Sequence, residues 1–204
     1  TLPLELINIT SLEELDITGT AGTVGIAGVA GDVFGKMTNL KKLSANNNSF
    51  SGDLAWLQNL SKLTDLKMDN NQLSGTIDWK HFGTALVTIY LKNNKLEGTL
   101  DGISRLAKLK NLYMSQNQLS GILPVELTQC TAMSYLVLDN NNITGSIPAE
   151  IAQMNLGYSG LVLKQNRMSG AIPNEVLSSA LWKKLYPETN IYPQQEGYGF
   201  SNVQ

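Results

Sequence analysis

Residues 86–98 read LVTIYLKNNKLEG and contain a pattern that recurs along most of the chain. An apolar residue stands at the first, fourth and sixth positions and an asparagine at the ninth, so the unit is L-x-x-L-x-L-x-x-N. The asparagines of six such units, separated by 23 to 25 residues, are Asn48, Asn71, Asn94, Asn117, Asn141 and Asn166. A fixed period of this size is the sequence signature of a solenoid, in which each repeat forms one coil.

The apolar positions of each unit predict a short strand with one buried face. Apolar and polar residues alternate through Leu86-x-x-Ile89-x-Leu91, which is the period of two that a half-buried strand requires. The intervening x residues must then point outward. One such strand in every coil would stack into a parallel sheet, and the outward residues would form columns that cross it.

Two further elements of the repeat have structural explanations. The asparagine side chain carries both a donor and an acceptor, so a buried amide can pair the backbone groups left where the chain turns inward. We therefore predict a structural ladder of stacked amides. The glycine of segments such as Leu119-Ser120-Gly121 suits a tight turn with positive φ or a close backbone approach, and the prolines at 124, 148 and 173 mark the convex side of the coil.

The full consensus L-x-x-L-x-L-x-x-N-x-L-S-G-x-I-P resembles the plant-type subclass of leucine-rich repeats over about residues 12–177. The resemblance implies an α/β solenoid shaped as a curved horseshoe, with a parallel β-sheet on the concave face and short turns or 3-10 segments on the convex face. We expect one leucine-rich repeat domain over residues 1–204, with about seven repeats. Its N-terminal end is expected to be truncated, because the first residues read like the tail of an earlier repeat.

The two ends of the solenoid depart from the consensus. Val176, Leu177, Leu181, Trp182 and Leu185 follow the last repeat at helical spacing, so residues 178–204 are expected to form a C-terminal helical cap. In the first unit Thr20 replaces the asparagine and lies 28 residues before Asn48. A glycine-rich surface loop from Gly19 to Gly35 would account for that longer step.

The cysteine count and the C-terminal sequence bear on the source and the cellular location of the protein. Cys130 is the only cysteine, so the chain lacks the paired cysteines that usually close plant receptors of this type. Residues 181–187 and 190–195 resemble the tail of secreted or surface leucine-rich repeat proteins from gut anaerobic bacteria. We therefore expect a bacterial protein that is secreted or displayed on the cell surface, with no signal or anchor in this chain.

Several classes of function are disfavoured by the sequence. The net charge is −2 and no basic run is present, which disfavours nucleic acid as a partner, and no apolar stretch is long enough to span a membrane. Neither paired catalytic carboxylates nor a nucleophile with a base can be picked out, so we expect no enzyme, cofactor or metal site. His81 is interpreted as a partly exposed structural residue, and Cys130 as a small buried hydrophobe.

The outward columns are the informative part of the repeat, because the consensus does not dictate them. Tyr90 and Tyr113 share the central column and Tyr135 lies beside it, so the three are the expected anchors of a ligand. The adjoining column alternates in charge and is placed to pair internally or with a partner. The candidate ligand-binding residues are Tyr90, Tyr113, Tyr135, Lys67, Asp69, Lys92 and Asp139.

Three functions remain open at this point. The first is non-catalytic recognition of a protein or peptide on the concave face. The second is carbohydrate binding, with the tyrosines stacked on sugar rings. The third is a purely structural spacer, in which the tyrosines simply suit strands and the polar columns are solvated.

Overall fold

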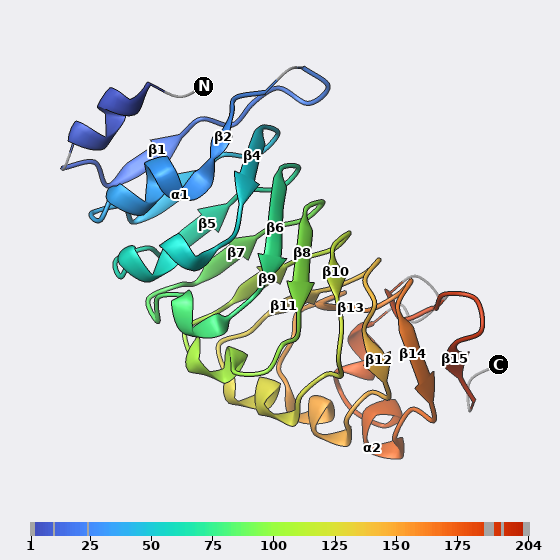
Figure 1. The fold of residues 1–204 in the computed structure, drawn as a ribbon. Coiled ribbons are helices and arrows are strands. Elements are labelled where there is room, and N and C mark those ends of the chain that lie inside the picture. The colour runs from blue at the N-terminus through green and yellow to red at the C-terminus, as the bar shows by residue number, and fades with distance from the viewer. Residues whose placement is uncertain (1–2, 10, 24, 186–189, 193, 202–204) are drawn as a thin grey trace.

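The computed structural model describes residues 3–9, 11–23, 25–185, 190–192 and 194–201. Its coils stack side by side into an elongated solenoid (Figure 1). A seven-stranded parallel sheet, which we call the main sheet, has the strand order β1-β3-β5-β7-β9-β11-β13. These strands are β1 (Glu14–Asp16), β3 (Lys42–Ser44), β5 (Asp65–Lys67), β7 (Thr88–Tyr90), β9 (Asn111–Tyr113), β11 (Tyr135–Val137) and β13 (Leu161–Val162). The predicted parallel sheet with one strand per coil is confirmed.

The register of the main sheet repeats from coil to coil. Leu43 lies opposite Leu66, which lies opposite Ile89 in the next strand. These side chains are fully buried between the sheet and the far wall of the coil. Residues on either side of them in each strand point away from the core, and we call this outward surface of the main sheet the concave face.

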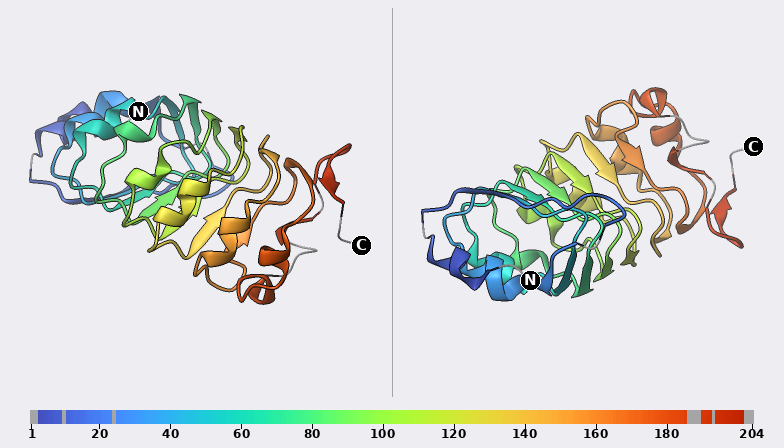
Figure 2. Two further views of the ribbon diagram at one scale, coloured as in Figure 1. Left: turned by 90° about the horizontal axis from the view of Figure 1, so that it is seen from below. Right: turned by 90° about the horizontal axis from the view of Figure 1, so that it is seen from above.

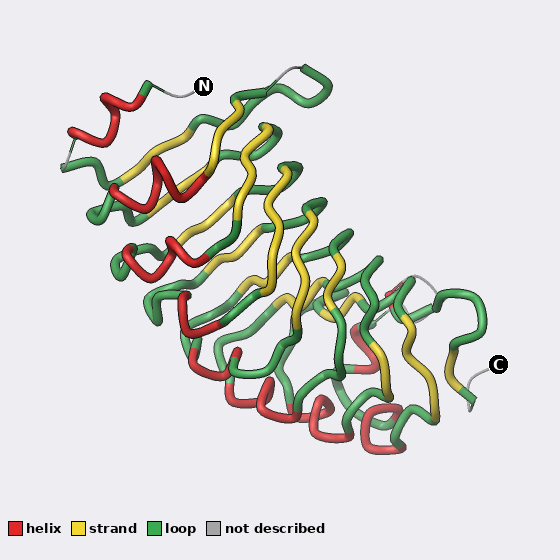
Figure 3. Tube along the Cα trace, in the orientation of Figure 1, coloured by secondary structure: helices red, strands yellow, loops and turns green. Residues whose placement is uncertain are grey.

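Helical segments line the opposite wall, as the tube in Figure 3 shows. Most are single 3-10 turns, which confirms the expected 3-10 segments. Pro124, Pro148 and Pro173 each directly precede one of these segments, where a fixed φ and a missing N–H are tolerated. The segments are η1 (Leu4–Asn8), α1 (Ala30–Val33), η2 (Phe34–Lys36), η3 (Ala55–Asn59), η4 (Trp79–His81), η5 (Ile103–Arg105), η6 (Val125–Gln129), η7 (Ala149–Gln153), α2 (Asn174–Leu177) and η8 (Trp182–Lys184). No helix among the described residues is long and apolar enough to cross a membrane.

A second set of parallel strands, absent from our sequence-based expectation, follows the asparagine of each repeat. One sheet has the order β10-β8-β6-β4-β2, and another has the order β12-β14-β15. At Gly98, φ is +105° and an added Cβ would lie 3.1 Å from the backbone nitrogen of Ile77, so glycine permits close packing of adjacent coils. The strands are β2 (Ala27–Val29), β4 (Ser49–Gly52), β6 (Gln72–Thr76), β8 (Lys95–Gly98), β10 (Gln118–Leu119), β12 (Thr144–Gly145), β14 (Arg167–Gly170) and β15 (Gly199–Phe200).

The buried asparagines form the ladder that the repeat predicts. Asn117 is 8% exposed, and its Nδ2 donates to the carbonyls of Leu91 at 2.9 Å and Met114 at 3.1 Å. Its Oδ1 accepts the backbone N–H of Leu96 at 3.0 Å. Each amide thus joins its own coil to the coil before it. Breaking such a set of buried hydrogen bonds costs about 1–3 kcal/mol for each group left unpaired.

The expected glycine-rich loop is shorter than the sequence suggested. Of the segment from Gly19 to Gly35, the second half forms β2, α1 and the start of η2, and both Ala30 and Phe34 are fully buried. Of the described residues in the first half, 19–23 and 25–26 remain as an irregular connection. The prediction was wrong for the second half because apolar residues among the glycines are recruited into the core, which glycine spacing by itself does not reveal.

The C-terminal segment forms two short helices and then one additional rung, by which we mean a further stretch of chain that hydrogen-bonds to the last coil as one coil does to the next. After α2 and η8, the backbone N–H of Leu163 donates to the carbonyl of Asn190 at 2.6 Å. Gln194 then takes the ladder position: its Oε1 accepts the N–H of Met168 at 3.2 Å, and its Nε2 donates to the carbonyl of Leu163 at 3.2 Å. Figure 2 shows this end of the solenoid from two further directions. Residues 186–189, 193 and 202–204 of the expected cap lie outside the described residues.

Candidate ligand-binding surface

Each full strand of the main sheet contributes two outward residues to the concave face. The residue two positions after the strand, which we call its flank, contributes a third. The central column contains Lys67, Tyr90, Tyr113, Val137 and Val162, because these residues lie opposite one another in the register of the main sheet. Tyr135 lies opposite Asn111 and so belongs to the neighbouring column, as the sequence spacing predicts. All three tyrosines are half-buried.

The structure brings the three tyrosines into one cluster. The ring centroids of Tyr90 and Tyr113 are 4.7 Å apart with an interplanar angle of 62°, an edge-to-face arrangement. Those of Tyr113 and Tyr135 are 6.1 Å apart at 31°. Both separations are typical of favourable aromatic pairs. We call Tyr90, Tyr113 and Tyr135 the tyrosine cluster.

Charged neighbours border the cluster at Tyr90. Lys67 Nζ lies 5.7 Å from the centroid of the Tyr90 ring, within the range of a cation–π contact. Burial raises the pKa of Tyr90, and the carboxylates of Asp69 and Asp65 raise it further. Burial likewise raises the pKa of Tyr113. These two hydroxyl groups therefore stay protonated at neutral pH and offer both a donor and an acceptor to a ligand.

The two aspartates of the predicted site support the sheet. Asp69 Oδ1 accepts the backbone N–H of Lys92 at 2.7 Å, so this side chain bridges two coils. Asp139 accepts from Ser115 Oγ at 2.5 Å and from Asn140 Nδ2 at 2.7 Å.

The column that contains Asp69, Lys92 and Asp139 alternates in charge, and internal ion pairing was one of the two roles that this suggested. Such pairing does not occur among the described residues. Their ion pairs join Lys41 to Glu13, Lys42 to Glu14 and Lys80 to Asp78.

The polar residues that precede the ladder asparagines have a conformational role that the sequence analysis missed. Asn47, Asn70 and Asn93 have φ values of 55°, 56° and 53°, in the left-handed region where asparagine is favoured. Their side chains form a chain: Asn93 donates to Asn70 at 2.9 Å, and Asn70 donates to Asn47 at 2.8 Å. The recurrence of Asn or Gln at this position was the available signal.

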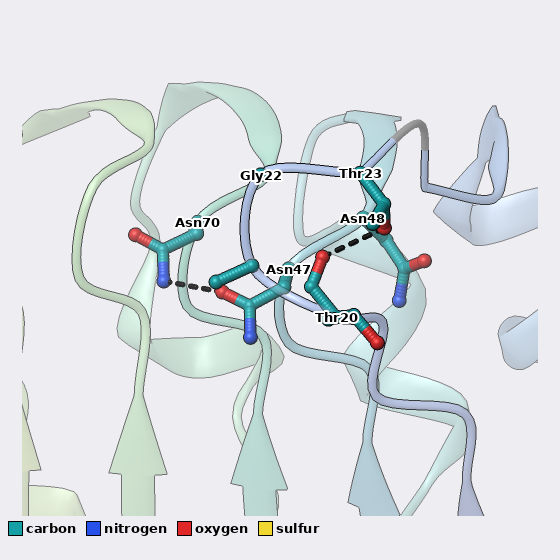
Figure 4. A pocket seen from close by; sticks show the side chains of 7 residues that line it. Thr20, Gly22, Thr23, Asn47, Asn48 and Asn70 are labelled. Carbon is teal, nitrogen blue, oxygen red and sulfur yellow. Dashed lines mark hydrogen bonds between the residues drawn. The ribbon is translucent and has the colours of Figure 1, made fainter.

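A shallow polar pocket lies beside the first irregular connection (Figure 4). It encloses about 340 Å³ and is lined by residues 20–23 together with Asn47, Asn48 and Asn70. Its groups are engaged with this chain: Thr23 Oγ1 donates to the Thr20 carbonyl at 2.7 Å, and Asn47 accepts from Asn70. The pocket is neutral and lacks an aromatic wall, so it offers less to a ligand than the tyrosine cluster does.

A second hollow of about 410 Å³ lies on the helix-bearing side of the solenoid, around Ile122 and Val125. These side chains are 58% and 47% exposed. The consensus leaves the position of Ile122 unconstrained, and polar residues occupy it in several other coils, as at Asp53 and Thr76. The sequence analysis did not single out this apolar surface.

The remaining candidates for chemistry have structural environments. Cys130 is buried, and this burial raises the pKa of its thiol, which confirms its interpretation as a small hydrophobe. His81 ends η4 and is partly exposed, as expected. Within the described ranges, no group of three or more His, Cys, Asp or Glu residues is placed to hold a metal ion.

Comparisons with known proteins agree with this architecture. Leucine rich repeat families match residues 84–143 and 133–154. No curated protein sequence matches the chain significantly.

Two solved plant structures are similar over most of this chain. The leucine-rich repeat ectodomain of the membrane receptor kinase GASSHO1/SCHENGEN3 from Arabidopsis thaliana, in complex with CASPARIAN STRIP INTEGRITY FACTOR 2, has a TM-score of 0.77 and 30% identity. The match covers 100% of this chain and 22% of that one. The plant peptide hormone receptor RGFR1 in complex with RGF2 has a TM-score of 0.75 and 32% identity, covering 86% of this chain and 28% of the receptor.

A bacterial structure is also similar. A leucine-rich repeat protein of Leptospira interrogans has a TM-score of 0.67 and 25% identity, and the match covers 91% of this chain and 50% of that one. The chain therefore spans less than a third of the two plant ectodomains and half of the bacterial protein. The repeats, the asparagine ladder and these likenesses show that the chain has the leucine-rich repeat fold, with plant-type receptor ectodomains among its structural neighbours.

Proposed function

We propose that this protein is a non-catalytic binding module that holds a protein or peptide on its concave face. The observation that carries the proposal is the tyrosine cluster, three packed aromatic side chains that the repeat consensus does not require. Tyrosine presents a large apolar ring with a polar tip and is enriched among the residues that dominate binding energies. Around the cluster, Lys67, Asp69, Lys92 and Asp139 would form the polar border of the site.

The rigidity of this surface supports a binding role. The rings are held by each other and by the main sheet, in which β7, β9 and β11 each pair with a strand on both sides. A ligand would therefore order few side chains of this protein on association. Because the loss of side-chain freedom opposes binding by about 0.5–1.5 kcal/mol for each immobilised flexible side chain, a preformed surface favours affinity.

The similar structures support the choice of a protein or peptide ligand. RGFR1 is described as a peptide hormone receptor, and its structure contains RGF2. We extend this kind of partner to the present chain. We also propose a secreted or cell-surface location, supported by the ectodomain neighbours, and a bacterial origin, supported by the single cysteine, the tail motif and the Leptospira neighbour.

The test is capture of secreted and surface proteins with the wild type and with a Tyr90→Ser, Tyr113→Ser, Tyr135→Ser triple variant. We expect a partner that the wild type retains and the triple variant loses by at least about tenfold, as for hot-spot residues. The matched control is Tyr198→Ser, since Tyr198 is exposed but lies in the C-terminal rung. Thermal unfolding of all three proteins verifies that the variants are folded.

A glycan array run in parallel separates the alternatives. Binding of a glycan, in place of a protein, that depends on the three tyrosines would replace the proposal with the carbohydrate-binding function. Equal capture by the wild type and the folded triple variant would contradict a site at the tyrosine cluster. The absence of any partner or glycan would favour a structural spacer.

A further inference from the structure

Charge is distributed unevenly along the concave face. The outward positions of β1, β3 and β5 and of their flanks contain four carboxylates, at Glu14, Asp16, Asp65 and Asp69, against the lysines Lys42 and Lys67. The same positions from β7 to β13 contain two lysines, Lys92 and Lys164, against the single carboxylate of Asp139. The net charge of these outward positions is therefore −2 over the first three coils and +1 over the last four.

In the acidic half, the lysines are already engaged with this chain. Lys42 Nζ pairs with Glu14 Oε1 at 2.8 Å, and Lys67 lies over the ring of Tyr90. Asp16 accepts hydrogen bonds from Thr18, and Asp65 accepts one from Thr64, which leaves further lone pairs for a ligand. Basic groups of a ligand would therefore find hydrogen-bond acceptors on the acidic half of the concave face.

In the basic half, the carboxylate is the group that is engaged. Both oxygens of Asp139 accept hydrogen bonds, from Ser115 and from Asn140. The ammonium groups of Lys92 and Lys164 make no hydrogen bond or ion pair with any other described residue. These two ammonium groups remain available to an anionic ligand group.

The tyrosine cluster lies where the two halves meet. Tyr90 is in β7, directly beside β5 in the order of the main sheet, and Tyr113 and Tyr135 follow in β9 and β11 (Figure 1). Val137 and Val162 continue the central column toward the last coil. Along the axis of the solenoid, the concave face is thus acidic over β1–β5 and aromatic and apolar over β7–β11, where Lys92 flanks Tyr90, and it ends with Lys164 at the flank of β13.

We infer that the ligand is an extended dipolar peptide whose basic end lies over β1–β5, whose central apolar residue packs on the tyrosine cluster, and whose acidic end pairs with Lys164 at the flank of β13. This inference rests on the proposed function and adds the charge order of the ligand. Neighbouring strands are about 4.8 Å apart and an extended chain advances about 3.3 Å per residue, so the five steps from β3 to β13 correspond to roughly eight residues. The charges contact solvent, and their effect decreases as salt increases.

Four dye-labelled ten-residue peptides with the same central Leu-Phe-Leu segment test the inference by fluorescence anisotropy. The first has lysines at one end and glutamates at the other; the second has the same composition with alternating charges; the third has lysines at both ends, and the fourth glutamates at both. We expect the dipolar peptide to bind about tenfold more tightly than the other three at low salt, with the difference decreasing at high salt.

Two pairs of charge reversals give the matched comparison. Lys92→Glu with Lys164→Glu should weaken the dipolar peptide about tenfold and strengthen the peptide with two lysine ends. Lys36→Glu with Lys108→Glu changes the net charge equally outside the concave face, and it should leave both affinities within about twofold of the wild type.

The outcomes separate this inference from the proposed function. If the wild type binds all four peptides equally and the triple tyrosine variant binds none, the tyrosine site stands and the charge order is wrong. If the triple tyrosine variant binds as the wild type does, the proposed site itself is wrong. No measurable binding of any of the four peptides by the wild type would also overturn the inferred charge order.

Discussion

At the scale of single residues, Asp69 shows how a candidate binding residue also supports the fold. Its Oδ1 accepts the N–H of Lys92, while one coil earlier the amide oxygen of Asn46 accepts the N–H of Asp69 at 2.9 Å. The same position is thus served by a carboxylate in one coil and by a neutral amide in another. The fold requires the acceptor at this position and does not require its charge.

The pKa of Asp69 leads to a prediction about stability. Burial raises the pKa of this carboxyl group, against the opposing effects of the hydrogen bond and the charge of Lys92. An acid with a raised pKa binds its proton more readily in the folded state, so its contribution to stability is greatest at low pH and is lost as pH rises through the raised pKa. Asp69→Asn should therefore unfold with an equal or higher free energy than the wild type at pH 7, and this difference should shrink on acidification.

Urea unfolding at several pH values measures this difference. Asp69→Ala is the matched variant, because it removes the acceptor and leaves the Lys92 N–H unpaired, which should cost about 1 kcal/mol. An Asn variant as unstable as the Ala variant at neutral pH would show that the charge of Asp69 is itself required.

At the scale of the elements, the ladder extends beyond the consensus repeats to Gln194. The longer glutamine side chain reproduces the pairing of the asparagines, accepting from Met168 and donating to Leu163. The pairing of β15 with β14 follows from the same stacking, since Gly170 lies opposite Phe200. The tail therefore covers the last coil with a rung of the same kind.

Replacing Gln194 by alanine should loosen this rung alone. The backbone groups of Leu163 and Met168 would lose partners, and each unpaired buried group costs about 1–3 kcal/mol. Because a coil contacts only its neighbours, we expect trypsin to cleave after Lys184 roughly tenfold faster, without faster cleavage in the central coils. Glu196→Ala, at an exposed position of the same segment, is the control. Accelerated cleavage throughout the chain would contradict independent behaviour of the rung.

At the scale of the whole molecule, burial increases from the first coil toward the centre. Leu12, Leu15 and Ile17 are only half-buried, whereas Leu109 and Leu112, in the middle of the solenoid, are fully buried. The first coil also lacks an asparagine at the ladder position, where Thr20 stands. Fewer buried contacts and hydrogen bonds give a lower local free energy of opening.

Native-state hydrogen exchange should reveal this gradient. We expect amides paired between β7 and β9 to exchange at least about tenfold more slowly than those paired between β1 and β3, because the first coil opens without the others. The comparison requires correction for intrinsic exchange rates. Uniform protection along the main sheet would indicate that the solenoid opens only as a single cooperative unit.

The amino-acid sequence by itself determined the period, the buried face of each main strand and the ladder asparagines. These features follow from patterns within one repeat: Leu86, Ile89 and Leu91 can be buried together only if the strand between them has one face inward. The same alternation assigned Tyr90 and Tyr113 to one outward column. Each of these conclusions needs only the pattern within one repeat and the distance at which that pattern recurs.

Tertiary structure alone decided which partners the outward residues find. The second set of strands, the rung at Gln194 and the contact of Tyr135 with Tyr113 all join residues that lie one coil apart. The same holds for Asp69, whose partner Lys92 is 23 residues away. Such contacts depend on how closely one coil stacks on the next, a distance set by the packing of the whole solenoid, and the pattern within a repeat carries no measure of it.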